Sequence, residues 1–286
     1  MSALELLKKI LRIWATEGFG GVTARIRRRW RLWTFRPCIL EKQYGGFRFE
    51  FYVGTREGQE WYGKFVDTRL YKPVAPELTW LASAAKRGDI VADVGAHHAY
   101  FALLFSHWVG DNGTVFAFEC LPENAEIAER NVRLNRLRNV QVVKKAVGAR
   151  SGTVEVADNS GGILVDRAST ANVITVEMIA LDEFFGRSPP SLLKIDVEGY
   201  ELEVLKGARV CLAARPTIAL EFHCFKFKDP TSQVEEILRL LPKDRYHYKL
   251  AREAGEELTD YSISGHSAGE IGRQYNPHLY GIPAPS

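Results

Sequence analysis

The 286-residue chain has few cysteines, and their spacing excludes several kinds of site. The four are Cys38, Cys120, Cys211 and Cys224, and no C-x-x-C pair occurs among them. This scatter argues against a zinc ribbon, a redox dithiol and the disulfide framework of a small secreted domain. A reducing environment fits such cysteine usage, so we expect a cytoplasmic protein.

Long apolar runs are also missing. No stretch approaches the roughly 18 uncharged residues of a membrane-spanning helix, and the N-terminus lacks the short apolar block and small-residue cleavage site of a signal peptide. With 46% hydrophobic and 26% charged residues, the composition is that of a globular chain and not of a disordered one. We expect one folded domain over residues 46–286, neither secreted nor transmembrane.

Charge is distributed unevenly along the chain. Residues 1–45 hold ten basic and three acidic residues, a net charge of +7, whereas the remainder carries −4. Apolar residues recur at helical spacing from Ala3 to Trp14, and an arginine-rich stretch runs from Arg25 to Trp33. Residues 1–45 are therefore interpreted as a basic amphipathic extension.

Two roles for this extension stay open. Its apolar stripe can pack on the main domain or on a second copy of the chain as a homo-oligomer, or residues 1–33 can lie on an anionic membrane surface, peripheral to the inner face of the membrane. No nucleic-acid-binding motif accompanies the arginines, so a nucleic-acid partner is not expected.

From residue 89 onward the sequence alternates between strand and helix patterns. Strands are predicted at 89–94, 114–119, 140–143, 192–195 and 217–222, and helices at 100–108, 122–135, 201–206 and 233–241. Such alternation is typical of an α/β fold with a parallel, doubly wound sheet. The segments 153–156 and 173–176 are predicted to form a small inserted hairpin.

Two of these strands end in carboxylates followed by a glycine. Asp93 and Gly95 stand at the end of the first strand, and Asp196 and Glu198 directly follow strand 192–195. Ligands of open α/β sheets bind beyond the carboxyl ends of the strands, so these acids are expected to face a ligand. A glycine there lets the backbone approach the ligand, and Glu119 after the second strand can accept both hydroxyls of a ribose.

The loop after the first strand lacks the phosphate-binding pattern of dinucleotide-binding domains. G-x-G-x-x-G would seat a pyrophosphate on the helix N-terminus, but the loop reads Gly95-Ala-His-His-Ala-Tyr100. S-adenosylmethionine carries no phosphate and needs only a close-approach glycine and two acids. Asp93, Gly95 and Glu119 therefore favour this cofactor over NAD.

Taken in order, these residues resemble the FkbM-type S-adenosylmethionine-dependent methyltransferases over roughly residues 60 to 282. The blocks that carry the resemblance are Val91-Ala-Asp-Val-Gly-Ala96, Phe116-Ala-Phe-Glu-Cys-Leu-Pro-Glu-Asn124, Ala146-Val-Gly148 with Gly152, Leu181-Asp182, Lys194-Ile-Asp-Val-Glu-Gly-Tyr-Glu201 with Leu205-Lys-Gly207, and Glu221-Phe-His223. The block from Lys194 to Glu201 is specific to this family, whereas the first glycine block alone is not.

The resemblance implies a class I methyltransferase fold, a Rossmann-like, doubly wound, seven-stranded sheet, here with a basic helical N-terminal extension. It also implies methyl transfer to oxygen on a small-molecule or glycan acceptor, such as a sugar or a secondary metabolite. By the same carry-over, Asp93, Gly95 and Ala96 would line the methionine part of the cofactor, Glu119 its ribose, Ala146 and Val147 its adenine, and Asp196 the reactive methyl.

Transfer to a hydroxyl needs a base, and the candidates follow the fourth and fifth predicted strands. His223 is preferred because its ordinary pKa near 6.5 suits proton removal at neutral pH, and the alternatives are Asp196, Glu198 and Glu221. His223 can instead be a hydrogen-bonded core residue. The four side chains can also converge on a hard cation, so Mg²⁺ is an alternative. We expect no zinc at His97 and His98, which lack a carboxylate or cysteine at ligand spacing.

The first loop departs from the pattern that the resemblance leads us to expect. The family usually reads Asp-x-Gly-Ala-Asn-x-Gly, and this chain has His97 for the asparagine and Ala99 for the second glycine. A methyl group at residue 99 can crowd a left-handed backbone position or the cofactor, whereas His97 keeps a hydrogen-bond donor there. The alternative function is a degenerate, non-catalytic scaffold recruited through its basic N-terminus.

Overall fold

The computed structural model describes residues 34–44, 46–62, 74–157, 173–253 and 255–284. The predicted amphipathic segment 1–33, with the membrane and oligomer contacts proposed for it, lies outside the described residues. Within the described residues, none of the helices combines the length and apolar character needed to cross a bilayer.

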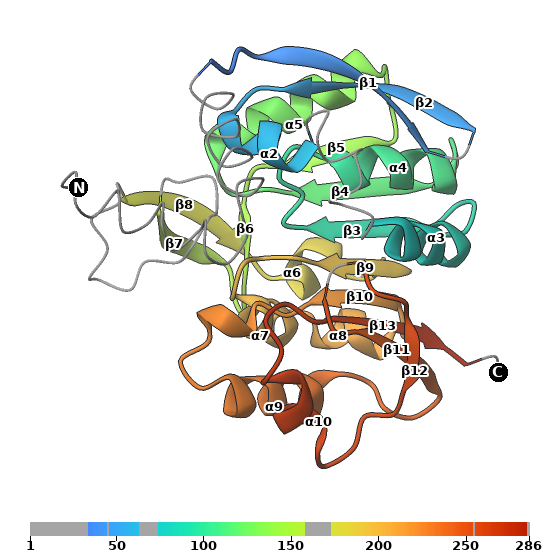
Figure 1. Ribbon diagram of the computed structural model, residues 1–286, viewed down its shortest axis with the longest axis vertical. Helices are drawn as coiled ribbons and strands as arrows, with labels where there is room; N and C mark the ends of the chain where they lie inside the picture. The colour runs from blue at the N-terminus through green and yellow to red at the C-terminus, as the bar shows by residue number, and fades with distance from the viewer. Residues whose placement is uncertain (1–33, 45, 63–73, 158–172, 254, 285–286) are drawn as a thin grey trace, which may run out of the picture.

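The main sheet has eight strands, and its parallel part contains the strands predicted from the sequence (Figure 1). In spatial order they are β12 (Thr259–Tyr261), β11 (Tyr246–Ala251), β13 (His278–Pro283), β10 (Thr217–Glu221), β9 (Leu192–Ile195), β3 (Ile90–Val94), β4 (Thr114–Phe118) and β5 (Val140–Val143). The five strands from β10 to β5 are parallel, and β13 runs antiparallel to both β10 and β11. The sheet is therefore mixed and mostly parallel.

Helices cover both faces of this sheet, as the alternation of strand and helix predicts. One face is covered by α3 (Val74–Ala84), α4 (Tyr100–Val109) and α5 (Pro122–Leu134). The other is covered by α6 (Leu181–Phe185), α7 (Glu201–Lys206), α8 (Arg209–Ala213), α9 (Pro230–Leu240) and α10 (Ser267–Ile271).

Successive residues of each central strand enter the two cores alternately, because strand side chains point to opposite faces. In β4, Val115 and Ala117 pack in the core with α4, whereas Phe118 packs in the core with α6 and α7. Both faces are buried, so these strands consist mostly of apolar residues. A charged side chain within such a strand, as at Asp93 or Lys194, is an exception that needs a partner or a function.

The order of the strands reverses between β3 and β9. From β3 the chain adds β4 and then β5 on one side, and it returns to place β9 and then β10 on the other side. Parallel sheets bind ligands at this switch point, beyond the carboxyl ends of the two adjacent strands. Asp93 and Gly95 at the end of β3 and Asp196 after β9 are therefore brought to one place.

An antiparallel hairpin, not predicted from the sequence, lies over α5 (Figure 1). It consists of β1 (Cys38–Tyr44) and β2 (Phe47–Val53) and leads into α2 (Arg56–Tyr62). Asn131 on α5 accepts a hydrogen bond from the backbone N–H of Tyr52 and donates one to its carbonyl. The domain boundary predicted between residues 45 and 46 falls in the turn of this hairpin, so β1 pairs with the domain that follows it.

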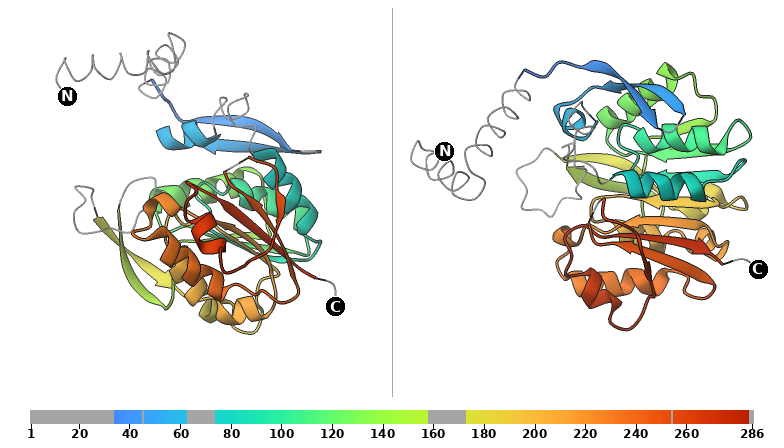
Figure 2. Two further views of the ribbon diagram at one scale, coloured as in Figure 1. Left: turned by 60° about the horizontal axis from the view of Figure 1, so that its bottom comes forward. Right: turned by 45° about the vertical axis from the view of Figure 1, so that its right-hand side comes forward.

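A separate three-stranded sheet stands beside the main one (Figure 2). It contains β6 (Ala146–Val147), β7 (Gly152–Ala157) and β8 (Val173–Ile179), with β7 and β8 antiparallel. The predicted inserted hairpin is thus confirmed, and β6 adds a short parallel strand to it.

The predicted elements from residue 89 onward are confirmed to within a few residues, and the strand count differs from seven. The helix predicted at 233–241 begins earlier, at Pro230, where the Asp229 side chain accepts from the N–H of Ser232. The eighth strand, β12, is a three-residue edge strand that pairs only with β11. The segment Thr259–Tyr261 contains no apolar run that could have predicted this strand.

Candidate active site

The loop after β3 passes so close to the loop after β9 that only glycine fits at residue 95. Gly95 has a φ of +85°, and a Cβ built on it would lie 1.7 Å from the carbonyl oxygen of Asp196. The N–H of Asp196 donates to the carbonyl of Val94 at 2.9 Å, which continues the strand pairing up to this contact. The two loops are therefore fixed against each other, and Gly95 is required for the contact itself.

Asp93 is a buried carboxylate without a hydrogen bond. Its exposed fraction is 0%, and neither oxygen accepts a hydrogen bond from the part of the chain that the structure describes. The nearest cation is the ammonium of Lys194, 3.9 Å from Asp93 Oδ1. Burial raises the pKa of Asp93 to about 6. Such a group is costly unless a ligand supplies donors, so Asp93 is a candidate for contact with a ligand.

Lys194 joins the Asp93 side of the site to Asp196. Its side chain is buried on β9, and its Nζ lies 3.0 Å from Asp196 Oδ2. Burial opposes ionisation of Asp196, but the charges of Lys194 and His223 lower its pKa to about 2. Asp196 is therefore ionised throughout the physiological range. In the sequence, Lys194 is a charged residue within an otherwise apolar strand, and this could have identified it as a site residue.

Glu119 follows β4, and the backbone of the neighbouring loops holds its carboxylate in place. One oxygen accepts from the N–H of His97 at 2.8 Å and the other from the N–H of Leu121 at 2.9 Å. Burial raises the pKa of Glu119 to about 7. Each carboxylate oxygen retains lone pairs for further donors, such as the hydroxyls of a ribose.

The residues that depart from the family pattern adopt the strained backbone that their positions require. His97 has a φ of 49° and Ala99 a φ of 66°, both in the left-handed region that favours glycine. Ala99 is fully buried just before α4 begins. The methyl group is thus accommodated in the folded chain, at a backbone cost of roughly 1–2 kcal/mol.

The rings of His97 and His98 stack on each other, with centroids 3.9 Å apart. Because the φ values of His97 and Ala99 are both positive, the loop turns tightly enough to bring the two rings together. Burial lowers the pKa of His97 to about 4 and that of His98 to about 2, so both are neutral at pH 7.

Helix α2 packs directly on this loop. The Tyr62 hydroxyl is hydrogen-bonded to His97 Nδ1 at 3.0 Å, and the Tyr62 ring packs against both histidines. A Cβ at Gly58 would lie 2.4 Å from His98 Cε1, so α2 approaches as closely as glycine permits. Helix α2, which the sequence did not predict, thus packs against the loop of residues 95–99, which we call the cofactor loop after its expected role.

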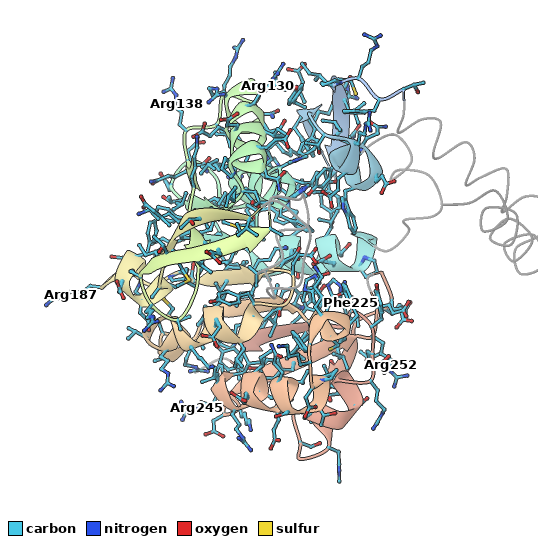
Figure 3. The ribbon with its side chains drawn as sticks, turned by 90° about the vertical axis from the view of Figure 1, so that its left-hand side faces the viewer. Arg130, Arg138, Arg187, Phe225, Arg245 and Arg252 are labelled. Atoms are coloured by element: carbon cyan, nitrogen blue, oxygen red, sulfur yellow. The ribbon has the colours of Figure 1, made fainter. Side chains whose placement is uncertain are left out.

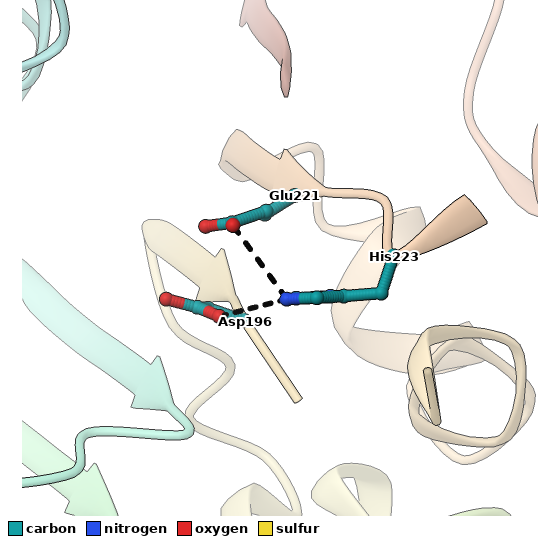
Figure 4. Close-up of side chains that lie close together, drawn as sticks. All are labelled: Asp196, Glu221 and His223. Carbon is teal, nitrogen blue, oxygen red and sulfur yellow. Dashed lines mark ion pairs between the residues drawn. The ribbon is translucent and has the colours of Figure 1, made fainter. Parts of the chain in front are cut away.

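The second half of the site surrounds His223 at the end of β10 (Figure 4). Its Nε2 lies 3.8 Å from Asp196 Oδ1, 3.6 Å from Glu198 Oε2 and 3.6 Å from Glu221 Oε1. The side chain is 3% exposed. The four predicted catalytic residues are therefore brought together, although they come from the last residue of β10 and from the loops after β9 and β10.

Glu201, which the site prediction did not include, orients His223. The Nδ1–H of His223 donates to Glu201 Oε1 at 2.7 Å, and the same oxygen accepts from the N–H of Gly199 at 2.9 Å. Glu201 has an exposed fraction of 0% at the first turn of α7. This contact directs Nε2 toward the other three acids. In the sequence, Glu201 could have been identified as the acid that ends the family-specific block Lys194–Glu201.

The residues around His223 shift its pKa away from the ordinary value on which its choice as the base depended. Burial by itself would lower the pKa of His223, but the hydrogen bond to Glu201 and the charges of Glu221 and Asp196 raise it to about 9. His223 is thus a stronger base than an ordinary histidine, and it is largely protonated at neutral pH. Burial also raises the pKa of Glu221, with a further contribution from the charge of Asp196.

Part of this cluster has the composition of a cation site. Asp196, Glu221 and His223 each offer one ligand atom, and these atoms all lie within 4.8 Å of one another. Carboxylate oxygens suit Mg²⁺, which otherwise keeps several waters. Two of the three already have cationic or donor partners, since Lys194 contacts Asp196 and the Asn276 amide donates to Glu221.

Ala146 and Val147, expected near the adenine, form β6 at the edge of the small sheet. Val147 is buried in the core with Phe118, and Ala146 is half-buried and pairs with Met178. Ala96 is buried directly after Gly95. Contact of these residues with a cofactor stays a prediction.

Sequence comparison relates the chain to known methyltransferases. The model of the methyltransferase FkbM domain matches residues 93–250, more than half of the chain. A curated relative, the hexuronic acid methyltransferase AglP of Haloferax volcanii, is 30% identical over 149 residues. That match covers 50% of this chain and 59% of the relative, so the chain spans less than two thirds of the relative's length.

Two solved structures have a similar arrangement. One is a methyltransferase FkbM from Methylobacillus flagellatus, with a TM-score of 0.45 and 16% identity, over 68% of this chain and 44% of that one. The other is an rRNA methylase from Streptococcus thermophilus, with a TM-score of 0.46 and 10% identity, over 76% of this chain and all of that one (100%).

Proposed function

This chain belongs to the methyltransferase FkbM domain family, and we propose that it transfers a methyl group from S-adenosylmethionine to a hydroxyl oxygen of a sugar. One observation carries the proposal. Asp196 joins the two halves of the site, because its carboxylate contacts Lys194, beside Asp93, and also faces His223. A cofactor held at Asp93 would therefore lie next to a base.

The residues present fit S-adenosylmethionine. The cofactor carries an ammonium and a sulfonium, and it would supply an electrophilic methyl group. Asp93 offers two buried oxygens without donors, and acids outnumber bases among the side chains around it. Asp93 would bind the ammonium, Glu119 the ribose hydroxyls, and Gly95 would let the backbone approach.

His223 would remove the proton of the acceptor hydroxyl at Nε2. Glu201 fixes its ring through Nδ1, and Glu221 and Asp196 stabilise the imidazolium that results. Glu198 has a φ of 58°, a strained conformation for a residue with a side chain, and this directs its carboxylate toward the same nitrogen. Asp196, Glu198 and Glu221 are the alternative bases.

The raised pKa of His223 predicts a rising pH profile. A base must be neutral to accept a proton, and a pKa of about 9 leaves it mostly protonated at pH 7. We expect log(kcat/KM) to rise with pH at about unit slope and to level off near pH 9. Steady-state assays from pH 6 to 10 measure this, and a plateau already reached at pH 6 would exclude His223 as the base.

The cofactor role of Asp93 predicts a selective loss of binding. Asp93→Asn keeps the shape but removes the charge, so we expect S-adenosylhomocysteine to bind about tenfold more weakly or worse. The melting temperature should change little, because the buried carboxylate is replaced by a neutral group and Lys194 keeps Asp196 as its ionic partner. Calorimetric titration measures the affinity, and Glu155→Gln on the exposed surface of β7 is the control. Unchanged affinity in Asp93→Asn would contradict the assignment.

Mg²⁺ bound by Asp196, Glu221 and His223 is a second candidate role for the cluster, favoured by the convergence of three ligand atoms. We expect activity to survive treatment with EDTA, because Lys194 and the protonated His223 already offset these carboxylates. Loss of activity with EDTA and recovery with Mg²⁺ would establish the metal role and remove His223 as the base.

The acceptor class is inferred from the relative, whose name specifies a hexuronic acid. The test is methyl transfer from radiolabelled S-adenosylmethionine to methyl β-D-glucuronide, beside the neutral methyl β-D-glucoside. Transfer to either sugar supports the proposal. If the protein fails to bind S-adenosylhomocysteine, the degenerate scaffold becomes the better explanation and the role of residues 1–33 the next question.

A further inference from the structure

Two stacked aromatic side chains lie exposed beside the His223 cluster. Phe225 and Tyr275 come from distant segments, yet their ring centroids are 4.3 Å apart and their planes differ by only 7°. Phe225 is 45% exposed and Tyr275 is 64% exposed. Aromatic side chains usually contribute to stability by burying their faces. A stacked pair that stays open to solvent is therefore available for contact with a ligand.

The segments that carry the two rings are the segments that form the site. Phe225 lies in η1 (Cys224–Lys226), directly after His223, and the centroids of these two rings are 5.8 Å apart. Tyr275 precedes Asn276, whose amide donates to the Glu221 carboxylate. Figure 3 looks onto the edge where the parallel strands end, and Phe225 is labelled on that side. The aromatic pair therefore lies next to His223, the proposed base.

The aromatic pair and the nearby acids offer a ligand two different kinds of contact. The aromatic pair presents apolar ring surface, and Asp196, Glu198 and Glu221 present oxygens that accept hydrogen bonds from hydroxyls. A pyranose ring has a face of C–H groups and a rim of hydroxyl donors, so it satisfies both sides at once. A flat aromatic acceptor would stack equally well but would offer few donors to three acids.

We propose that Phe225 and Tyr275 form a platform for a pyranose ring of the acceptor and position one of its hydroxyls toward His223. This inference rests on the proposed function and specifies how its acceptor is held. Lys226 adjoins the platform, with its Nζ 5.4 Å from the centre of the Phe225 ring and paired with Glu198. Neither aromatic residue takes part in the chemistry, and both are positioning residues.

The test measures sugar binding separately from cofactor binding. Methyl β-D-glucuronide is titrated into the full chain and followed by saturation-transfer NMR, with and without S-adenosylhomocysteine. We expect Tyr275→Ala and Phe225→Ala each to weaken the sugar's Kd by about tenfold, while the affinity for S-adenosylhomocysteine stays unchanged. Tyr275→Phe keeps the ring and should bind the sugar as the original chain does.

The control variant is Val210→Ala on α8, an exposed apolar residue (56%) outside the platform and the cluster. Sugar binding that is equal in the Tyr275→Ala, Phe225→Ala and Val210→Ala chains would overturn the platform. So would the absence of sugar binding together with binding of catechol, which would assign the rings to a flat acceptor. Failure to bind S-adenosylhomocysteine contradicts the proposed function alone, because the sugar titration is also run without it.

Discussion

Replacing His223 by alanine is expected to lower kcat for methyl transfer by about 10²- to 10⁴-fold, the contribution of a positioned general base. The affinity for S-adenosylhomocysteine should stay within about threefold, because Asp93 and Glu119, assigned to the cofactor, follow other strands. Steady-state transfer to methyl β-D-glucuronide and calorimetric titration measure the two quantities. His247→Ala, an exposed histidine of β11, is the matched control.

Glu201→Gln separates the chemistry of His223 from its orientation. The amide oxygen can still accept from His223 Nδ1, but the negative charge that raises the pKa of His223 is lost. The pH at which kcat/KM levels off should therefore move below 9, with a smaller loss of kcat at high pH than in His223→Ala. If Glu201 only stabilised the fold, the melting temperature would change and the pH profile would not.

Replacing Lys194 by methionine is expected to lower the free energy of unfolding by about 3–5 kcal/mol, the usual result of removing one partner of a buried ion pair. Methionine fills the space of the Lys194 side chain, so the loss comes mainly from Asp93, which remains buried without its nearest cation, and also from Asp196, which is 27% exposed. Urea unfolding measures the change. Lys249→Met in the exposed pair with Asp260 is the control and should cost less than about 1 kcal/mol.

Lys194→Met should also reverse the pH dependence that Asp196 contributes to the free energy of unfolding. In the original chain the pKa of Asp196 is about 2, below its unfolded value, so its contribution is present above pH 4 and is lost as the pH falls through 2. Without Lys194, the pKa of Asp93, which burial already raises to about 6, rises further, and the pKa of Asp196 loses the largest influence that lowers it. The destabilisation should then be smaller at pH 5 than at pH 8, and an equal loss at both would contradict the pairing.

The five parallel strands and the helices between them could be predicted because the strands are mostly apolar on both faces, whereas the antiparallel strands β11, β12 and β13 were not predicted. Pro122 occupies the first turn of α5 and Gly207 follows the last residue of α7, and both helix ends were predicted, whereas the start of α9 at Pro230 was placed three residues too late. The candidate acids could be predicted because they directly follow such strands. In both cases the signal is local, within one element and its end.

The hairpin of β1 and β2, helix α2 and the orienting Glu201 could not be predicted in the same way. The hairpin is held by side chains of α5, and α2 by the rings of the cofactor loop, which are far away in the sequence. The stacking of Phe225 on Tyr275 likewise joins two loops that have no shared pattern. Contacts of this kind depend on the tertiary arrangement, which periodicity does not encode.

The contact between Gly58 and His98 limits which residues can be substituted in α2 and in the cofactor loop. Because a Cβ at residue 58 would overlap the His98 ring, the sequence of α2 and the sequence of the cofactor loop must vary together. Introducing the family's Asn-x-Gly at residues 97–99 would remove the hydrogen bond from Tyr62 to His97 and leave Tyr62 without its partner. We therefore expect a graft of this loop into another chain to need α2 as well.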